Sequence, residues 1–426
     1  MSVYFDNGSL DTVYSDKMKN EALKKILSAI GGKPKKILLL PPDGSRFYSN
    51  AGLLSSMLYD LLSPSAEVFL MPALGTHFPM TESEIRHMFG PNIPLDRFLN
   101  HNFRTAVRHL GTVPAEKISE YSEGAVSYPM DVAVNTNFLD AGYDCILSIG
   151  QIVPHEVIGM ANYTKNICVG IGGSDMINKS HYLGAAYGME RIMGRINTPV
   201  RKALDYGYDT FIKRPEIHFI FTVMGPSASG LVMRGMFAGN DKEAFVKAAK
   251  LSQQVNLDML AAPLKKAVVY LEPAEFKSTW LGNKAIYRLR MAMADDGELI
   301  ILAPALHQFG EDAEMDRLIR KFGYHGTEKT KQAVIDNEEL RANLGAAAHL
   351  IHGSSDGRFR ITYCPGSGMN ENEIRSAGFN YVSYETMIKK YNHNILKAGW
   401  NTSGGEDFFY VPNPALGLWA LKKQFA

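Results

Sequence analysis

Cysteine is scarce in this chain of 426 residues, and the scarcity excludes two kinds of protein. The three cysteines, Cys145, Cys168 and Cys364, are odd in number and far apart in the sequence. A disulfide framework needs paired cysteines and a Cys-rich zinc site needs closely spaced ones, so we expect neither. This usage fits a reducing cytoplasm best.

Net charge is nearly absent as well, with 45 Lys and Arg against 44 Asp and Glu. The chain therefore has no overall field that would attract nucleic acid or a membrane surface, and any anionic ligand must be held by a local site. No apolar run approaches the roughly 18 residues of a spanning helix. The polar start, MSVYFDNGSLDT, lacks the basic and apolar regions of a signal peptide. We expect no nucleic-acid partner and no membrane.

The composition that remains is that of a globular protein, with 46% hydrophobic and 21% charged residues. The length exceeds what one compact core usually organises, which predicts two domains. We place the boundary near residue 260, giving an N-terminal domain over 1–260 and a smaller C-terminal domain over 261–404. The tail, 405–426, is apolar and aromatic, and we expect it to pack back on the first domain.

Strand and helix patterns alternate along the chain. KKILLLPPDGSR is an apolar strand running into a turn, and GLLSSMLYDLL after it has helical spacing. AEVFLMPALGTH repeats the scheme before MTESEIRHMF, in which Thr81 and Glu84 predict a capping box. Further apolar runs are YDCILSIGQIVPHE, KNICVGIGG and EIHFIFTVMG, and a later strand–helix–strand segment has GNKAIYRLRMAMA as its helix. The alternation predicts an α/β fold with largely parallel sheets.

Polar side chains follow the ends of three predicted strands. Asp43 and Arg46 follow the first, His77 follows the second, and His155 with Lys165 follow the third. Ligands of such sheets bind at the carboxyl ends of the strands. If the strands are neighbours, these groups converge on one edge and form a site.

Each candidate also has an ordinary structural explanation. Asp43 could simply form hydrogen bonds within its own β-turn. Alternatively, the N–H groups of that turn and the guanidinium of Arg46 could hold a carboxylate or phosphate. A lone histidine is usually structural, and a lysine at a strand end is either an anion clamp or a nucleophile. Gly172, in VGIGG, could let a phosphate approach the backbone, although the GxGxxG spacing is absent. His181 has no HExxH or CxxC context that would predict zinc, and Lys284 is most simply a solvated lysine.

In their order and spacing, these segments resemble the nickel-pincer lactate racemase family. The matching segments run from about residue 36 to about residue 310. The most specific feature is Lys165 ten positions after His155, with His181 sixteen positions after Lys165. The matching segments are PPDGSR, ALGTHFPMTESEI, PHEVIGMANYTK, the His of SHYLG and the Lys of GNKAI.

The resemblance implies two α/β domains with an active site in the cleft between them. It also implies a nickel-pincer nucleotide (pyridinium-3,5-bisthiocarboxylate mononucleotide nickel), which separate cofactor-maturation enzymes supply. The implied roles are Lys165 as the tether of the cofactor, His181 as the nickel ligand, His77 and His155 as the acid/base pair, Asp43 and Arg46 as groups that hold cofactor or substrate anions, and Lys284 as a partner of the substrate carboxylate.

These implied roles suit the inversion of carbon 2 in a 2-hydroxy acid. The hydrogen on that carbon is too weakly acidic to leave as a proton without large stabilisation. Oxidation to a planar 2-keto acid avoids the problem, because a base takes the hydroxyl proton while a hydride leaves and can return to either face. A base is then needed on each side, and histidine suits the task because its pKa lies near the working pH.

Three departures from the lactate-specific members point to a different substrate. Trp280 and Leu281 stand ahead of Lys284 where those members usually have Tyr-Gln, and Phe78 follows His77 where Arg is usual. The stretch before Lys165 reads GMANYTK in place of a Gly-rich one. We therefore predict a racemase or epimerase for another 2-hydroxy acid, with Trp280 among the substrate contacts.

The polar residues of that stretch leave two interpretations open. Asn162, Tyr163 and Thr164 could bond the extra hydroxyls of a sugar acid such as gluconate, or they could replace glycine only as packing.

Two other functions are also compatible with the residues. One is a cofactor-independent α/β enzyme that uses ordinary acid/base chemistry on a sugar acid or sugar phosphate. The other is a non-catalytic protein that binds the cofactor or a hydroxy acid.

Overall fold

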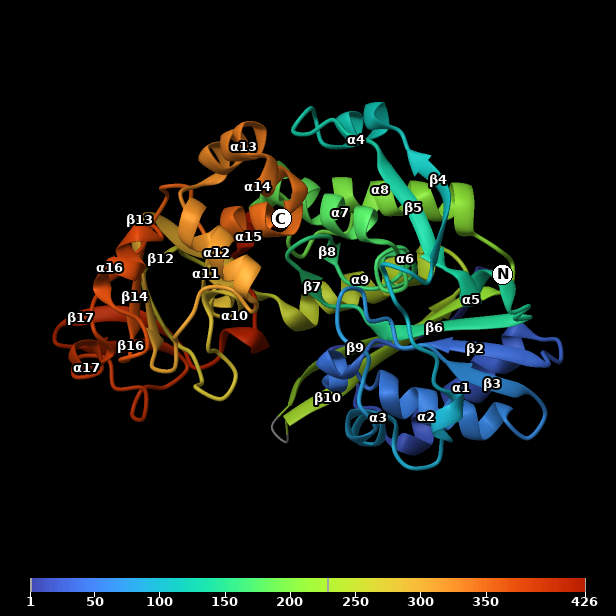
Figure 1. Cartoon of the computed structure of the whole chain (residues 1–426). Coiled ribbons are helices and arrows are strands. Elements are labelled where there is room, and N and C mark those ends of the chain that lie inside the picture. The colour runs from blue at the N-terminus through green and yellow to red at the C-terminus, as the bar shows by residue number, and fades with distance from the viewer. Residues whose placement is uncertain (1, 228–229, 426) are drawn as a thin grey trace. The chain divides into compact units, whose positions relative to one another are not determined.

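The computed structural model describes residues 2–227 and 230–425, which divide into two compact units (Figure 1). The N-terminal unit comprises Met1–Leu183 and Ile192–Asn256, and the C-terminal unit comprises Gly184–Arg191 and Leu257–Ala426. The division lies close to the boundary predicted near residue 260. The assignment of these units as domains, and of a cleft between them, stays a prediction.

A six-stranded sheet forms the core of the N-terminal unit, in the order β1-β10-β9-β6-β2-β3. Four neighbouring strands, β9, β6, β2 and β3, are parallel, whereas β10 and β1 are antiparallel at one edge. The predicted α/β fold with a largely parallel sheet is confirmed. The strands are β1 Val3–Gly8, β2 Lys36–Leu40, β3 Glu67–Leu70, β6 Cys145–Gln151, β9 Ile217–Ser227 and β10 Gly230–Gly239.

Helices cover both faces of this sheet, with α1, α2 and α3 on one side and α6, α8 and α9 on the other (Figure 1). The period of two in β9 explains the double cover: Ile220 joins the core beneath α1 and α2, and its neighbours Phe219 and Phe221 face Tyr163 and Phe245. The helices are α1 Asp16–Ile30, α2 Ala51–Leu62, α3 Glu82–Phe89, α4 Ala115–Tyr121, α5 Thr136–Asp140, α6 Thr164–Cys168, α7 Ser174–Tyr187, α8 Pro199–Gly207 and α9 Lys242–Asn256.

Shorter elements complete the N-terminal unit. The apolar run KNICVGIGG gives the short helix α6 and a turn, because its glycines follow within one helical turn of Cys168. Two short antiparallel pairs are β4 Val107–Val113 with β5 Met130–Asn135 and β7 Pro154–His155 with β8 Gly159–Met160. The other elements are the 3₁₀ turns η1 Gly44–Ser49 and η2 Leu95–Arg97 and the π-helix η4 Tyr208–Ile212. The 3₁₀ turn η3 Met189–Arg191 belongs to the C-terminal unit.

A second six-stranded sheet forms the core of the C-terminal unit, in the order β15-β14-β13-β12-β17-β16. Its pairs are parallel except β16 with β17. The strands are β11 Asp258–Leu260, β12 Leu264–Tyr270, β13 Met293–Ala303, β14 Arg360–Pro365, β15 Asn380–Tyr381, β16 Gly399–Ser403, β17 Glu406–Val411 and β18 Trp419–Leu421. The helices and 3₁₀ turns are α10 Thr279–Gly282, α11 Lys284–Leu289, α12 Ala313–Phe322, α13 Thr327–Asp336, α14 Glu338–Ala342, α15 Leu344–His352, α16 Glu371–Ser376, α17 Tyr384–Met387, η5 Pro414–Leu416 and η6 Lys422–Gln424.

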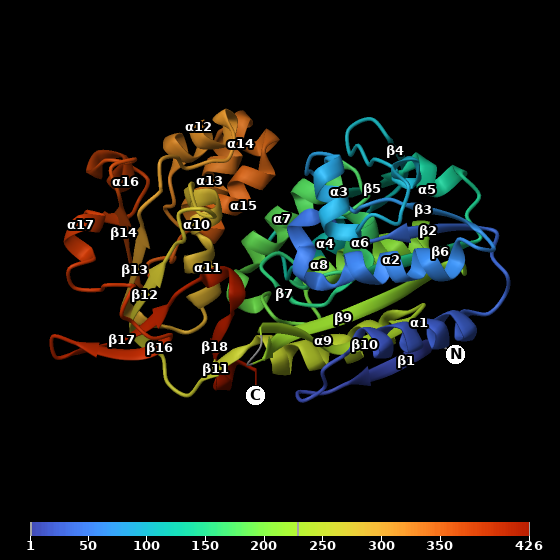
Figure 2. The same ribbon diagram turned by 90° about the horizontal axis from the view of Figure 1, so that it is seen from below.

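Two predictions for this unit are wrong in detail. The helix predicted over GNKAIYRLRMAMA ends at Leu289, because Met293 already pairs with Leu264 in the parallel ladder of β12 and β13. The tail, 405–426, supplies strands to the C-terminal unit, although we expected it on the first domain. Its strand β17 extends the sheet beside β12, and β18 pairs with β11 (Figure 2).

Across residues 2–227 and 230–425, no helix is long and apolar enough to cross a membrane. The three cysteines are buried free thiols.

The predicted capping box at α3 is confirmed and can be tested by mutation. The Thr81 hydroxyl accepts from the Glu84 N–H, and the Glu84 carboxylate accepts from the Thr81 N–H. Thr81→Ala should lower the free energy of unfolding by about 1 kcal/mol, measured by chemical denaturation. Thr81→Ser keeps the acceptor oxygen and should lose much less. Equal losses in the two variants would contradict a capping role.

Candidate functional site

The candidate site begins where three neighbouring strands of the N-terminal unit end. Strand β2 pairs with β3 on one side and with β6 on the other. Asp43 and Arg46 follow β2, His77 follows β3, and His155 follows β6 on the short strand β7. The neighbouring strands that the site hypothesis requires are therefore present.

Helix α6, which carries Lys165, is fastened to these strand ends by hydrogen bonds. The Asn166 side-chain amide donates to the Leu40 carbonyl of β2 and to the Ser148 hydroxyl of β6, both at 2.9 Å. The Gly75 N–H, in the loop that leads to His77, donates to the Gly170 carbonyl at 2.8 Å. The loops after all three strands thus meet around α6.

Asp43 and His77 form a carboxylate–imidazole pair. The Nδ1 atom of His77 lies 2.6 Å from Asp43 Oδ2, and the Ser45 hydroxyl donates to Asp43 Oδ1 at 2.5 Å. Burial alone would raise the pKa of Asp43, but these hydrogen bonds outweigh it and hold the pKa below its usual value. We predicted that Asp43 holds an anion. Both carboxylate oxygens of Asp43 accept hydrogen bonds, so this side chain can orient His77. Its predicted contact with a cofactor or substrate anion stays a prediction.

His155 is fixed in one tautomer by its own backbone. Its Nδ1 atom accepts the Val157 N–H at 3.1 Å, so a neutral ring must carry its proton on Nε2. That Nε2 atom lies 3.0 Å from Lys165 Nζ. A ring that already has a proton on Nε2 can only donate there, so the Lys165 amine accepts and must be neutral in this arrangement.

The surroundings of Lys165 favour a neutral amine at pH values above about 8. Burial lowers the pKa of Lys165 to about 8, and the charges of Arg46 and Arg201 act in the same direction against the opposing charge of Glu156. Burial also holds the pKa of His155, which is 5% exposed, well below its usual value. A neutral lysine amine is a nucleophile, which an ammonium is not.

His181 projects from α7 with one ring nitrogen already committed. Its Nδ1 atom donates to the Ile177 carbonyl one helical turn earlier, at 2.6 Å. This leaves the Nε2 lone pair for a metal, which is the arrangement that metal-binding histidines usually adopt. Burial lowers the pKa of His181, and Lys165 lowers it further when its amine is protonated. Within the part of the chain that the structure describes, no group of three or more His, Cys, Asp and Glu side chains is placed to hold a metal.

The segment just before α6 is strained. Asn162 and Tyr163 adopt φ values of 64° and 58°, which cost side-chain-bearing residues roughly 1–3 kcal/mol each. Tyr163 is buried against Phe219 and stacks on Phe245, and the Thr164 hydroxyl donates to Asp205. The structure therefore favours the packing interpretation of Tyr163 and Thr164 over contacts with the hydroxyls of a sugar acid.

Arg201 on α8 completes this segment, and sequence reasoning missed it. Its guanidinium is fully buried and donates to the carbonyls of Met160 and Asn162 and to the Thr164 hydroxyl. A signal for it was available in the sequence. With helical spacing, Arg201 falls on the same buried face of α8 as Leu204, where an unpaired charge is not tolerated.

Gly172 has a packing reason to be glycine. A Cβ atom there would lie 1.9 Å from the Cys168 carbonyl oxygen, and the Gly172 carbonyl accepts from His101 Nε2 at 3.1 Å. Its predicted contact with the cofactor stays a prediction.

The two substrate residues predicted from the later segment lie in the C-terminal unit. Lys284 Nζ lies 3.5 Å from Glu275 Oε1 and above the Phe276 ring, so it is paired with an acid and not simply solvated. Trp280 stacks on His349 with ring centres 4.1 Å apart. Their roles toward a substrate stay predictions.

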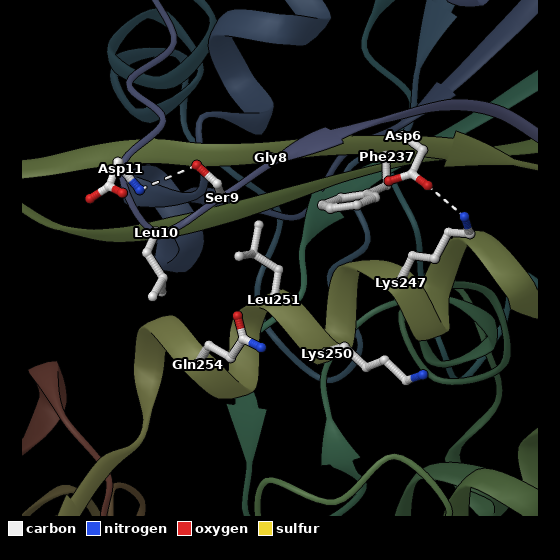
Figure 3. Close-up of a pocket in the computed structure, with 10 residues that line it drawn as sticks. All are labelled: Asp6, Gly8, Ser9, Leu10, Asp11, Phe237, Lys247, Lys250, Leu251 and Gln254. Carbon is white, nitrogen blue, oxygen red and sulfur yellow. Dashed lines mark hydrogen bonds and ion pairs between the residues drawn. The ribbon is translucent and has the colours of Figure 1, made fainter.

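A surface hollow of 490 Å³ on the N-terminal unit lies away from these residues, between the end of β1 and the side of α9 that carries Lys247, Leu251 and Gln254 (Figure 3). Lys247 on its wall is paired with Asp6 at 2.5 Å. Its lining residues, Asp6, Gly8, Ser9, Leu10, Asp11, Phe237, Lys247, Lys250, Leu251 and Gln254, include none of the predicted site residues.

Comparison with known proteins finds one matching domain. Residues 12–191 match the model of the lactate racemase N-terminal domain. That stretch contains the histidines 77, 155 and 181 together with Lys165. No curated protein sequence matches the chain.

Two solved structures resemble the whole chain. A protein from Thermotoga maritima is 25% identical with a TM-score of 0.79, and the match covers 98% of this chain and 100% of that one. The lactate racemase apoprotein from Thermoanaerobacterium thermosaccharolyticum is 16% identical with a TM-score of 0.69, covering 96% of this chain and 91% of that one. The second likeness, at this identity, shows the fold.

Together, the domain match and the shared fold support a lactate racemase-like class of protein. Residues 12–191 match the lactate racemase N-terminal domain, and the whole chain shares the fold of the lactate racemase apoprotein.

The neutral state of Lys165 can be tested by competitive acylation across a range of pH, read by peptide mass spectrometry. Lys165 should react with a midpoint near pH 8, because its ammonium loses a proton there, whereas an ordinary lysine titrates near about pH 10.4. His155→Ala should shift this midpoint upward, because the hydrogen bond to the neutral amine is lost. A wild-type midpoint equal to that of exposed lysines would contradict the assignment.

Proposed function

We propose that the chain is a racemase or epimerase that inverts carbon 2 of a 2-hydroxy acid with a nickel-pincer nucleotide tethered to Lys165. One observation carries the proposal: Lys165 Nζ lies 3.0 Å from His155 Nε2, beside a His181 whose Nδ1 is bonded to the Ile177 carbonyl and whose Nε2 is left as a ligand. The match of residues 12–191 to the lactate racemase N-terminal domain supports a racemase or epimerase type of reaction.

The residues present fit such a cofactor. A neutral Lys165 amine can form an amide-type bond, His181 offers one imidazole to nickel, and the exposed Arg46 guanidinium offers a fork for a phosphate or carboxylate. When bound, the cofactor would supply a carbon that accepts a hydride from the substrate and returns it.

The proton chemistry falls to the chain's own histidines. Asp43 holds Nδ1–H of His77, which leaves His77 Nε2 as the basic atom that exchanges a proton with the substrate hydroxyl. His155 is neutral at pH 7, because its pKa lies well below 6.5. A Lys165 nitrogen that is part of an amide would have a delocalised lone pair and would no longer accept from His155. This imidazole would then be free to adopt the tautomer with an unprotonated Nε2, which a second base requires.

The proposed substrate is a 2-hydroxy acid other than lactate, bound through Arg46, Lys284 and Trp280. Phe78 supports a departure from lactate, since it is 93% exposed beside His77 in place of the usual Arg. The proposal includes cofactor-maturation enzymes as partners and a cytoplasmic location, with neither nucleic acid nor membrane as a partner.

Intact mass and metal analysis test the cofactor directly, on protein produced together with the maturation enzymes. We expect an adduct on Lys165 and about one nickel per chain, because one imidazole and the ligand's own donors complete the site. Lys165→Ala should carry no adduct. A clean apo mass with epimerase activity would favour a cofactor-independent enzyme. An adduct without configuration change in any of a panel of hydroxy acids, lactate and gluconate included, would favour a binding protein.

Removal of either histidine tests the proton chemistry in the loaded protein. His77→Ala and His155→Ala should each lower kcat by about 10²–10⁴-fold, the usual contribution of a positioned base. His109→Ala is the control matched to His77. Like His77, His109 is about half exposed and lies beside a carboxylate, that of Asp131 at 3.5 Å. Full activity in either site variant would remove that residue from the mechanism.

A further inference from the structure

A fully buried arginine spans the segment that precedes Lys165. Arg201 lies in the first turn of α8, where Thr198 caps the helix and Pro199 begins it. Its guanidinium is 0% exposed, and within the described residues its Nε atom has no hydrogen-bond partner. An arginine buried in this way needs acceptors close at hand.

Those acceptors come from residues 160–164. The Nη2 atom donates to the Met160 carbonyl at 2.8 Å and to the Asn162 carbonyl at 3.0 Å. The Nη1 atom donates to the Thr164 hydroxyl at 2.7 Å. Three acceptors within five consecutive residues fix that stretch of backbone from one side.

Neighbouring groups hold Arg201 itself in place. Asp205, one turn later on α8, accepts the Thr164 hydroxyl proton at 2.7 Å and pairs with Lys242 at 2.8 Å. The guanidinium lies over the Phe245 ring of α9, 4.5 Å from its centre. The Thr198 hydroxyl donates to the Ile158 carbonyl at 2.9 Å, so the start of α8 is also bonded to the residue that precedes β8.

The fastened stretch contains the two positive-φ residues, Asn162 and Tyr163. Without glycine at these positions, the turn persists only if its surroundings hold it. Lys165 follows directly and places its amine 3.0 Å from His155. The orientation of that amine therefore depends on the stretch that Arg201 holds.

We propose that Arg201 is a positioning residue for Lys165: its three hydrogen bonds hold the strained turn at 162–163 and so aim the Lys165 amine at His155. The inference rests on the proposed function only for what the amine does, which is to bind the cofactor. The geometry of the amine itself is testable without any cofactor.

The test measures the acylation rate of Lys165 near pH 8 in the native full chain, relative to exposed lysines. Arg201→Met should lower this rate roughly tenfold, which corresponds to a rise of about one unit in the lysine pKa. Arg201→Lys should recover part of the rate, because an ammonium can reach some of the same acceptors. Arg214→Met is the control, since Arg214 also lies over a phenylalanine ring and donates to a main-chain carbonyl, both of Phe138.

The double variant Arg201→Met/Asn162→Gly separates positioning from plain stability or charge. Glycine relaxes one of the strained positions, so Lys165 labelling should recover several-fold without restoring the buried charge. A double variant no faster than Arg201→Met would overturn the proposal, and so would unchanged labelling in Arg201→Met.

If Arg201→Met does not fold, Thr164→Val replaces it as the test. This near-isosteric change removes one acceptor of Arg201 and should lower labelling in the same direction. Labelling equal to that of the wild type would overturn the proposal. Slow labelling in these variants, together with no nickel adduct in the wild type, would leave positioning intact while removing the proposed function.

Discussion

The hydrogen bond between His155 Nε2 and Lys165 Nζ is the interaction on which the site depends. Its direction follows from a neighbouring contact, because the Val157 N–H occupies His155 Nδ1 and leaves the ring only a donor at Nε2. A buried lysine would otherwise be a costly isolated cation. Above about pH 8 the cost is avoided by loss of the proton, and the result is a nucleophilic amine held beside an imidazole. The hydrogen bond thus connects Lys165, which the family resemblance assigns to tethering the cofactor, with His155, which it assigns to proton transfer.

The fold serves this interaction at two levels. Parallel strands β2, β3 and β6 bring their carboxyl ends together, and Asn166 ties α6 to two of them. On the other side of α6, a buried arginine holds a turn that the backbone would not adopt by itself. The sheet thus determines where Lys165 lies, and the turn determines where its amine points.

Much of this could be predicted from the sequence because it follows from local pattern. Apolar runs ending in polar turns gave the strand ends, and Thr81 with Glu84 gave a helix start that the structure confirms. The helix after Lys284 was predicted too long, because pairing of Met293 with a distant strand overrides helical spacing. The contact between Asp43 and His77 could not be predicted either, since the sequence does not show that the His77 ring reaches this carboxylate. Arg201 was missed for the same reason: its acceptors lie 37 to 41 positions away in the sequence.

The most direct test of this account is the tautomer of His155, read from two-bond proton–nitrogen NMR correlations in protein labelled with ¹⁵N-histidine at about pH 9, above the lowered lysine pKa. The account predicts a proton on Nε2 and an unprotonated Nδ1. A proton on Nδ1, with Nε2 accepting from a Lys165 ammonium, would contradict it.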